Sequence, residues 1–161
     1  MKFFTMDYWM GVQNNDIPDP NSEYLKHYNS IINHLPKSVV EYINEFNFHD
    51  SNLIHFEFNQ SDKIVKIKLF NRFKDKGFHV YAIEISDVES VILKSDPDKS
   101  LGGPGGFGDL GYSEFDYQDN VIIYSVLFST GIEIVIKFKG DIKVKQSAQQ
   151  GDAPEPASPA R

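Results

Sequence analysis

The chain of 161 residues has no cysteine and no long apolar run. The absence of cysteine excludes disulfides, thiolate zinc sites and a cysteine nucleophile. A membrane-spanning helix needs about 18 consecutive apolar residues, and no run in the chain approaches that length. The first residues, MKFFTMDYW, are too short and too polar for a signal peptide, because Asp7 interrupts the apolar patch. We therefore expect a cytoplasmic protein that does not enter a membrane.

Positive charge is also scarce, since 16 Lys and Arg residues stand against 23 Asp and Glu, for a net charge of −7. A general nucleic-acid binder has a basic footprint, so this balance argues against nucleic acid as a partner. It is compatible with a basic protein partner. A negative charge also keeps a protein soluble without any partner, and this simpler interpretation stays open.

The residues that are present suit a single globular domain. Hydrophobic residues make up 40% of the chain, and 13 Phe and 8 Tyr predict an aromatic-rich core. We assign residues 1–146 to this domain. Residues 147–161 are expected to be a disordered tail, because they are rich in Ala and Pro and hold too few large apolar side chains to order themselves. The abrupt change in composition indicates either a native linker or a fusion remnant.

Two helices are predicted before residue 50. Asn21 or Ser22 is a plausible N-cap, and Pro36 ends the first helix and can begin the second. The apolar positions of the first helix are Tyr24, Leu25, Tyr28, Ile31, Ile32 and Leu35. Those of the second are Val39, Val40, Ile43 and Phe46. Both sets follow helical spacing, so each helix has one face to bury.

After Asp50 the apolar residues recur with a period of two, which is typical of strands. The runs are LIHFEF, IVKIKLF, FHVYAIEI, DVESVILK, EFDYQ, VIIYSVLFS, IEIVIKF and IKVK. Helices grouped before a succession of strands indicate an α+β fold. We predict two N-terminal helices packed on a largely antiparallel sheet of about seven strands.

A glycine-rich stretch, SLGGPGGFGDLGY, holds six of the eleven glycines and contains a G-x-G-x-x-G pattern at residues 103–108. A dinucleotide site needs a helix after the glycines, but DLGYSEFDYQ alternates like a strand. No Gly-Lys-Ser/Thr follows, and Asp109, Glu114 and Asp116 would repel phosphate. We therefore reject a nucleotide site.

The same stretch is longer than a hairpin needs, and such connections are often functional. Either it only lets the chain turn, or it is an adaptable surface for a protein partner. The residues that we expect to bind a partner are Gly103, Gly105, Gly106, Phe107, Asp109, Leu110, Glu114 and Asp116. Glu114 and Asp116 lie two apart on a predicted strand, so they share a face that is typically exposed to solvent.

Metal and catalytic alternatives use the histidines and the acidic loop. We assign no catalytic residue, no metal site and no cofactor, but His49, His55 and His79 could converge on a metal if their strands were neighbours. Asp96, Asp98 and Asp109 could form an irregular calcium site, although the EF-hand register fails. Ser51 follows His49-Asp50, but neighbouring strand residues point to opposite faces, which argues against a catalytic triad.

The chain resembles a family of small bacterial α+β proteins that are similar to the immunity proteins of polymorphic toxins. The segments that carry this resemblance are LPKSVVEYINEFNFHDSNLIHFEF, LGGPGGFGDLGYSEFDY and FSTGIEIVIKF. The resemblance implies a non-enzymatic cytoplasmic protein that neutralises a cognate toxin by binding it. The alternative is a metal- or small-ligand-binding protein, or a hydrolase, that uses His49, His55, His79 or the acidic glycine-rich loop.

Overall fold

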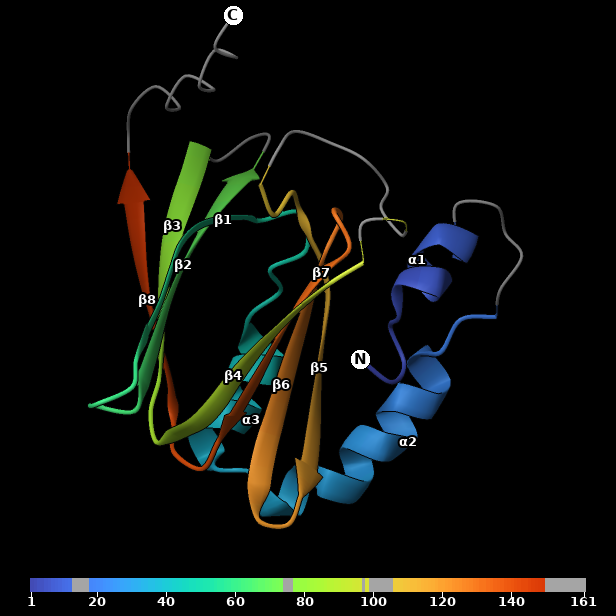
Figure 1. Ribbon diagram of the computed structural model, residues 1–161, viewed down its shortest axis with the longest axis horizontal. Coiled ribbons are helices and arrows are strands. Elements are labelled where there is room, and N and C mark those ends of the chain that lie inside the picture. Colours follow the sequence, from blue (N-terminus) through green and yellow to red (C-terminus); the bar gives the residue numbers. More distant parts are fainter. Residues whose placement is uncertain (13–17, 74–76, 97, 99–105, 150–161) are drawn as a thin grey trace, which may run out of the picture.

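The computed structural model describes residues 1–12, 18–73, 77–96, 98 and 106–149, without the side chains of residues 72, 73, 77, 148 and 149. The described residues form three α-helices, one short 3-10 helix and eight antiparallel strands (Figure 1). The predicted α+β class with antiparallel strands is confirmed. The predicted number of helices and the single sheet are both wrong, for reasons that lie in short local segments.

Two of the three helices were predicted. Helix α2 (Asn21–Ile31) continues into the 3-10 helix η1 (Ile32–His34), and α3 (Lys37–Glu45) begins directly after Pro36. Neither Asn21 nor Ser22 is the N-cap of α2, because Pro20 holds that position. Instead, the Asp19 carboxylate accepts a hydrogen bond of 2.9 Å from the backbone N–H of Asn21.

Helix α1 (Met6–Val12) was not predicted from the spacing of apolar residues, because seven residues are too few to show a helical period. The hydroxyl of Thr5 accepts a hydrogen bond of 3.2 Å from the Tyr8 backbone N–H, which supports its first turn. Its Trp9 ring packs against Gly111, where an added Cβ would lie 2.2 Å from the ring. The glycine therefore makes the room in which α1 docks.

The eight strands form two four-stranded sheets. Sheet A has the order β1-β2-β3-β8, and sheet B has the order β4-β7-β6-β5. The strands of sheet A are β1 (Asn52–Asn59), β2 (Ile64–Phe73), β3 (Gly77–Ile85) and β8 (Ile142–Gln149). Those of sheet B are β4 (Val88–Ser95), β5 (Leu110–Gln118), β6 (Val121–Phe128) and β7 (Ile132–Phe138). Strand β8 thus runs three residues past position 146, and residues 150–161 of the expected tail lie outside the described part.

Two tight corners divide the strands between the sheets. Between β3 and β4 the chain turns at Ser86 and Asp87, and Asp87 adopts a positive φ of 51°. Between β7 and β8 it turns at residues 139–141, where the Asp141 backbone N–H donates a 2.9 Å hydrogen bond to the Ser86 hydroxyl. The two corners therefore lie side by side and pass the chain from one sheet to the other.

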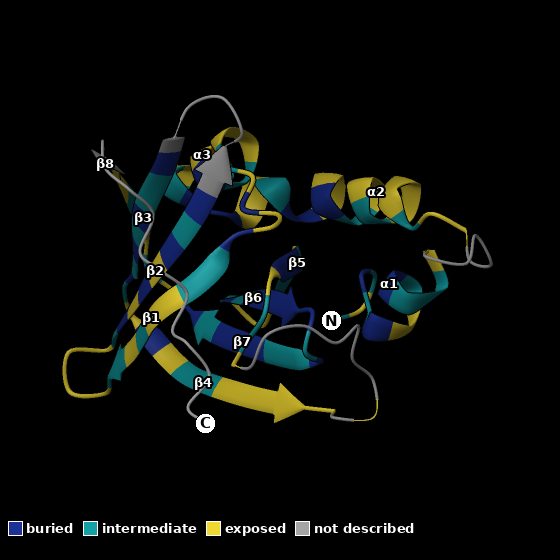
Figure 2. Cartoon of the chain, turned by 90° about the horizontal axis from the view of Figure 1, so that it is seen from above, coloured by how far each residue is buried: buried dark blue, intermediate teal, exposed yellow. Residues whose placement is uncertain are grey.

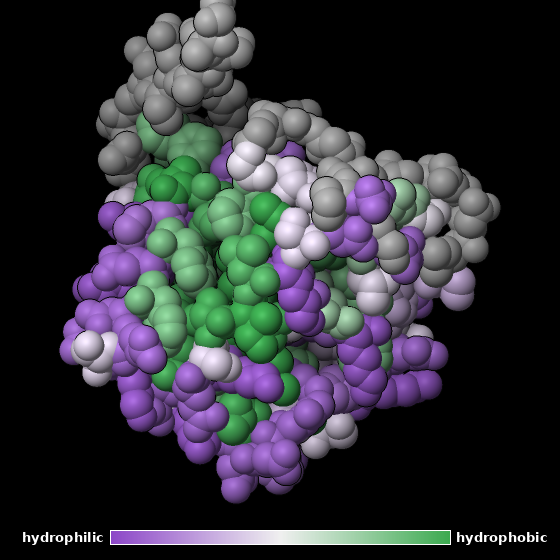
Figure 3. Space-filling view, in the orientation of Figure 1, coloured by the Kyte–Doolittle hydropathy of each residue, from purple (hydrophilic) through white to green (hydrophobic). Residues whose placement is uncertain are grey.

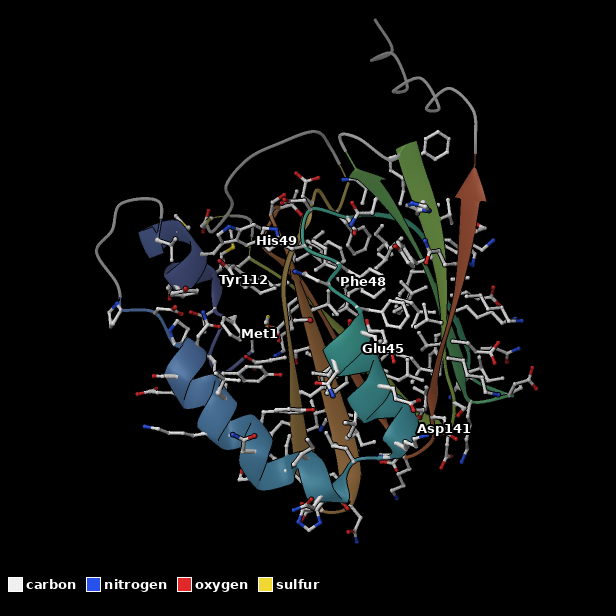
Figure 4. All side chains as sticks on the ribbon, turned by 180° about the vertical axis from the view of Figure 1, so that it is seen from behind. Met1, Glu45, Phe48, His49, Tyr112 and Asp141 are labelled. Atoms are coloured by element: carbon white, nitrogen blue, oxygen red, sulfur yellow. The ribbon has the colours of Figure 1, made fainter. Side chains whose placement is uncertain are left out.

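The core lies between the inner faces of the sheets and is closed by α3, which stands between them when the molecule is seen from behind (Figure 4). Tyr42 of α3 is buried, and its hydroxyl lies 2.7 Å from that of Tyr124 on β6. The Tyr124 ring stacks on Phe115 of β5 with centroids 4.4 Å apart. One helical side chain thus reaches the centre of sheet B.

On the opposite side the sheets diverge between β1 and β4. Figure 3 shows a hydrophobic band there, and Figure 2 shows that the second half of β4 is exposed. Leu93 and Ile54 are 56% and 55% exposed, although Leu93 lies opposite the buried Ile134. The inner face of sheet B is therefore not fully covered at its β4 edge.

The Tyr42–Tyr124 pair predicts a loss of stability in alkaline solution. Burial raises the pKa of Tyr124 to about 12 and that of Tyr42 well above its ordinary value of 10.0. The unfolded chain loses these protons near pH 10, so the stabilisation is complete below pH 10 and declines as the pH rises toward 12. Urea unfolding across this range is expected to show a decrease of roughly 2 to 3 kcal/mol for Tyr124 alone.

The double variant Tyr42→Phe/Tyr124→Phe is expected to show a shallower decline with pH than the parent. Tyr24, whose pKa burial also raises to about 12, remains in both proteins and serves as the common background. Equal slopes for the parent and the double variant would contradict this account.

Candidate functional site

An open groove of about 520 Å³ lies between α2, α3 and β5. Six of its fourteen lining residues are Phe or Tyr, and the lining contains no lysine, arginine or carboxylate. The lining residues are Phe4, Asn21, Tyr24, Leu25, Ile43, Phe46, Asn47, Phe48, His49, Leu110, Gly111, Tyr112, Ser113 and Phe115. The volume falls within the usual range of ligand and anchor-residue pockets. We regard this groove as the candidate functional site.

Helix α2 forms one wall of the groove, and Tyr24 links it to the edge of sheet B. The hydroxyl of Tyr24 accepts a hydrogen bond of 3.0 Å from the backbone N–H of Phe115. Burial raises the pKa of Tyr24 to about 12, so this hydroxyl stays neutral. Leu25, the next residue, is 57% exposed and presents an apolar surface to the groove.

The opposite wall follows the end of α3. The rings of Phe46 and Phe48 stack with centroids 5.7 Å apart, and Phe48 packs edge-on against Tyr81 at 5.1 Å. Figure 4 shows Phe48, His49 and Tyr112 grouped between α3 and the α1–α2 side. The edge contact between the His49 and Tyr112 rings, at 5.7 Å and 85°, completes this group.

His49 is held at the rim of the groove. Its backbone N–H donates a 3.0 Å hydrogen bond to Asn47 Oδ1, and its Nδ1 lies 2.9 Å from Asp50 Oδ1. Asp50 has a positive φ of 63°, which places a tight turn immediately before β1. The chain therefore changes direction at Asp50 as it enters β1.

Strand β5 presents backbone groups to the groove because it is an edge strand of sheet B. The Phe115 N–H points away from β6 and toward Tyr24. Since orientation alternates along an antiparallel strand, the N–H and C=O of Ser113 point the same way. Ser113 is exposed and lines the groove, so a polar ligand or an extended peptide can reach these groups.

Four exposed carboxylates lie close in the sequence to residues that line the groove. Glu23 precedes Tyr24, Glu45 precedes Phe46, Asp50 follows His49, and Asp19 binds the backbone of Asn21. The nearby cations are fewer. Lys26 follows Leu25 on α2, and the Lys2 ammonium lies 5.1 Å from the Phe3 ring centroid.

Glu114 is buried, which corrects the expectation that it lies with Asp116 on a face exposed to solvent. It is only 6% exposed, and its carboxylate accepts hydrogen bonds from the N-terminal backbone. Its donors are the N–H groups of Lys2, of Phe3 at 2.9 Å and of Phe4 at 3.3 Å. The Met1 amino group pairs with Glu133. The Glu114 carboxylate therefore anchors the N-terminal segment to β5.

Asp116 is also engaged within the molecule. It lies on the same face of β5 as Glu114, as predicted, and its Oδ1 lies 3.1 Å from His27 Nε2 of α2. The same carboxylate accepts hydrogen bonds from the backbone N–H of Tyr117 at 2.8 Å and from the Gln118 side chain at 2.6 Å. The contact with His27 helps to hold α2 against the sheet, and Asp116 is only half-exposed.

The glycine-rich residues are only partly described. Gly103 and Gly105 lie outside the described residues. Gly106 is exposed with a positive φ of 94°, and Phe107 is half-buried with its ring 5.2 Å from that of Phe128. A strand rather than a helix follows, as predicted, because β5 begins at Leu110.

Leu110 and Asp109 form hydrogen bonds that connect the start of β5 to the segment before and at the start of β1. Leu110 is 4% exposed and belongs to the core, and it also lines the groove, so its expected contact with a partner stays a prediction. Its N–H and C=O bond to the backbone of Ser51 and Asp50, each at 2.8 Å. Asp109 is exposed, and its carboxylate accepts a 2.6 Å hydrogen bond from Asn52.

The structure does not bring His49, His55 and His79 together. His55 lies opposite Lys68 on the outer face of sheet A, whereas His79 lies opposite the buried Asn71 on the inner face. Strand β2 also separates β1 from β3. Within the described residues, no three His, Cys, Asp or Glu side chains form a group that could hold a metal.

Ser51 is fully buried, with a relative exposure of 0%, so a substrate cannot reach its hydroxyl beside His49 and Asp50.

Sequence reasoning missed the groove itself. Its lining comes from the N-terminal segment, α2, α3, the link to β1 and β5, and only tertiary packing brings these segments together. A partial signal was the run EFNFHD at residues 45–50, in which aromatic and polar residues alternate directly after a helix.

Comparison with known protein families and with curated proteins finds no match for this chain. Among the helices of the described residues, none has both the length and the apolar character needed to cross a membrane. The groove geometry therefore carries the functional argument.

Glu114→Gln is expected to destabilise the fold by about 1 to 3 kcal/mol. The three backbone N–H groups now share two carboxylate oxygens, whereas an amide offers one acceptor oxygen and would place its NH₂ group against the remaining donors. Urea unfolding measures the free energy. Amide hydrogen exchange at residues 2–4 should accelerate in the same variant. Glu57→Gln, on the exposed face of β1, is the matched control and should change stability by less than about 0.5 kcal/mol. Equal effects of the two substitutions would contradict the anchoring role of Glu114.

Proposed function

We propose that this chain is a non-enzymatic binding protein of the immunity type, and that its groove receives a side chain or short segment of a basic protein partner such as a toxin. The observation that carries the proposal is the composition of the groove. Its lining is rich in Phe and Tyr and free of lysine, arginine and carboxylate side chains, while exposed carboxylates adjoin lining residues in the sequence.

Aromatic rings beside carboxylates favour a cationic anchor. The faces of Tyr24, Phe46 and Tyr112 attract an Arg or Lys side chain through cation–π interactions. Carboxylates at the rim then pair with the charged head of that side chain. The edge of β5 adds backbone donors and acceptors for the main chain of the partner. The net charge of −7 favours the approach of a basic partner.

The arrangement of polar side chains supports binding rather than catalysis. The hydroxyl of Ser51 is buried, and the three histidines proposed as metal ligands lie on different faces and segments. His49 is close to Asp50, but the groove lining offers it only the exposed Ser113 as a hydroxyl nucleophile besides tyrosines. A hydrolase needs a nucleophile and a base within hydrogen-bond reach.

The test uses the product of the gene adjacent to the one encoding this chain. Complex formation is measured by calorimetry, and protection is measured by growth on co-expression. Leu25→Lys places a cation in the groove and is expected to weaken binding about tenfold, a change of 1.4 kcal/mol. Leu93→Lys is the matched control, since Leu93 is 56% exposed against 57% for Leu25 and lies on the far edge of sheet B. It should leave the affinity within about twofold.

Two results would count against this proposal. One is that no complex forms and co-expression gives no protection. The other is that both lysine variants bind the partner as tightly as the parent, which would place the interface elsewhere.

A small ligand is the second candidate for the same groove, because about 520 Å³ is enough for a drug-sized molecule. A thermal-shift screen separates the two candidates. A compound that raises the melting temperature of the parent but not of an Asn47→Trp variant, which fills the groove, favours the small ligand.

A further inference from the structure

The outer face of sheet A carries a cluster of lysines on a chain that is otherwise acidic. Along β2, Val65 and Ile67 point inward and are buried, so the residues between and after them point to solvent. The outward lysines of β2 and β8 are Lys66, Lys68, Lys143 and Lys145, and all are exposed. Because the whole chain has a net charge of −7, this face stands out against the rest of the surface.

These lysines surround a hollow of about 280 Å³. At its centre, Ala82 of β3 lies opposite Lys68 on one side and Lys145 on the other. The alanine side chain ends at Cβ, so the surface is recessed between two long side chains. Strands lie about 4.8 Å apart, which separates the two lysine backbones by roughly 10 Å. Both ammonium groups can therefore reach one anion above Ala82.

Two carboxylates and a histidine share this face. Glu84 lies opposite Lys66 and Lys143, and Glu57 lies opposite Lys66 from β1. His55 lies opposite Lys68, with its Nε2 3.3 Å from Glu57 Oε2. Four ammonium groups thus face two carboxylates, both in the Lys66 row, which leaves the row of Lys68, Ala82 and Lys145 without an acidic residue.

The cluster lysines are not used in ion pairs with described side chains. The lysines that do have a carboxylate within 4.0 Å are Lys37, Lys63, Lys94 and Lys139. Lysine ammonium groups that converge on a recess without an internal partner are suited to an external anion.

We propose that this face binds an acidic segment of a protein partner, with one carboxylate seated above Ala82 between Lys68 and Lys145. A protein segment fits better than nucleic acid because the positive area covers only two residue rows on β2, β3 and β8, and Glu57 limits it on the β1 side. A longer polyanion would extend over surface of negative charge, where it is repelled. The face is separate from the groove, since sheet A and α2 lie on opposite sides of sheet B (Figure 1).

The probe is a short fluorescein-labelled peptide that alternates Glu and Ser, added to the full chain at low ionic strength and followed by anisotropy. The matched peptide alternates Lys and Ser, and a single-stranded oligothymidylate of similar length represents nucleic acid. The acidic peptide is expected to bind more tightly than both, and added salt should weaken its binding.

Lys68→Gln/Lys145→Gln is expected to lower the affinity for the acidic peptide about tenfold. Ala82→Glu, which places a carboxylate in the hollow, should have a similar effect. Lys26→Gln/Lys37→Gln removes the same charge from exposed helical positions outside the lysine cluster and should have less than about a twofold effect. The proposal is overturned if the acidic peptide does not bind, if the two double variants lose affinity equally, or if the oligothymidylate binds more tightly through the same lysines.

Discussion

The hydrogen bond between the hydroxyls of Tyr42 and Tyr124 fixes α3 in the gap between the two sheets, and the groove depends on that position. Phe46 and Phe48 follow α3 directly and form one wall, while Phe115 stacks on Tyr124 and forms part of the floor. The net gain from one such bond is only about 1 kcal/mol. A displaced α3 would leave the buried Tyr42 hydroxyl without this partner, so the pair selects one packing of helix on sheet more strongly than it stabilises the fold.

Local pattern accounts for most of the secondary structure but not for its division into two sheets. The runs FHVYAIEI and DVESVILK are separated by one residue, Ser86, and would suit neighbouring strands of one sheet. In the structure β3 pairs with β8, β4 pairs with β7, and the two do not pair with each other. The corner at Ser86 and Asp87 decides this outcome through its positive φ and its contact with residue 141. Apolar residues alternate with a period of two on both sides of such a corner, so this pattern does not show that the strands belong to different sheets.

The site was harder to predict than the fold because burial at β5 is set by distant residues. Glu114 alternates with Asp116 as an exposed strand residue would, and only the N-terminal segment, more than a hundred residues away in sequence, covers it. Leu110 belongs to the glycine-rich stretch but is buried, and its backbone pairs with Asp50 and Ser51. A carboxylate accepts several backbone donors only where tertiary packing supplies them, and no spacing in a single sequence encodes that.

The groove and the lysine face impose different conditions on a partner's approach. The net charge of −7 acts over the whole molecule, so a basic partner is attracted before contact and its association is accelerated. An acidic segment is repelled by the same field and is attracted only within about one Debye length, roughly 8 Å at physiological ionic strength, of Lys68 and Lys145. Binding at the lysine face therefore depends on contacts made after encounter, such as the carboxylate above Ala82, whereas binding at the groove also benefits from long-range steering. Salt therefore acts on the two surfaces through different steps. At the lysine face it changes the lifetime of the complex, and at the groove it changes the rate at which the complex forms.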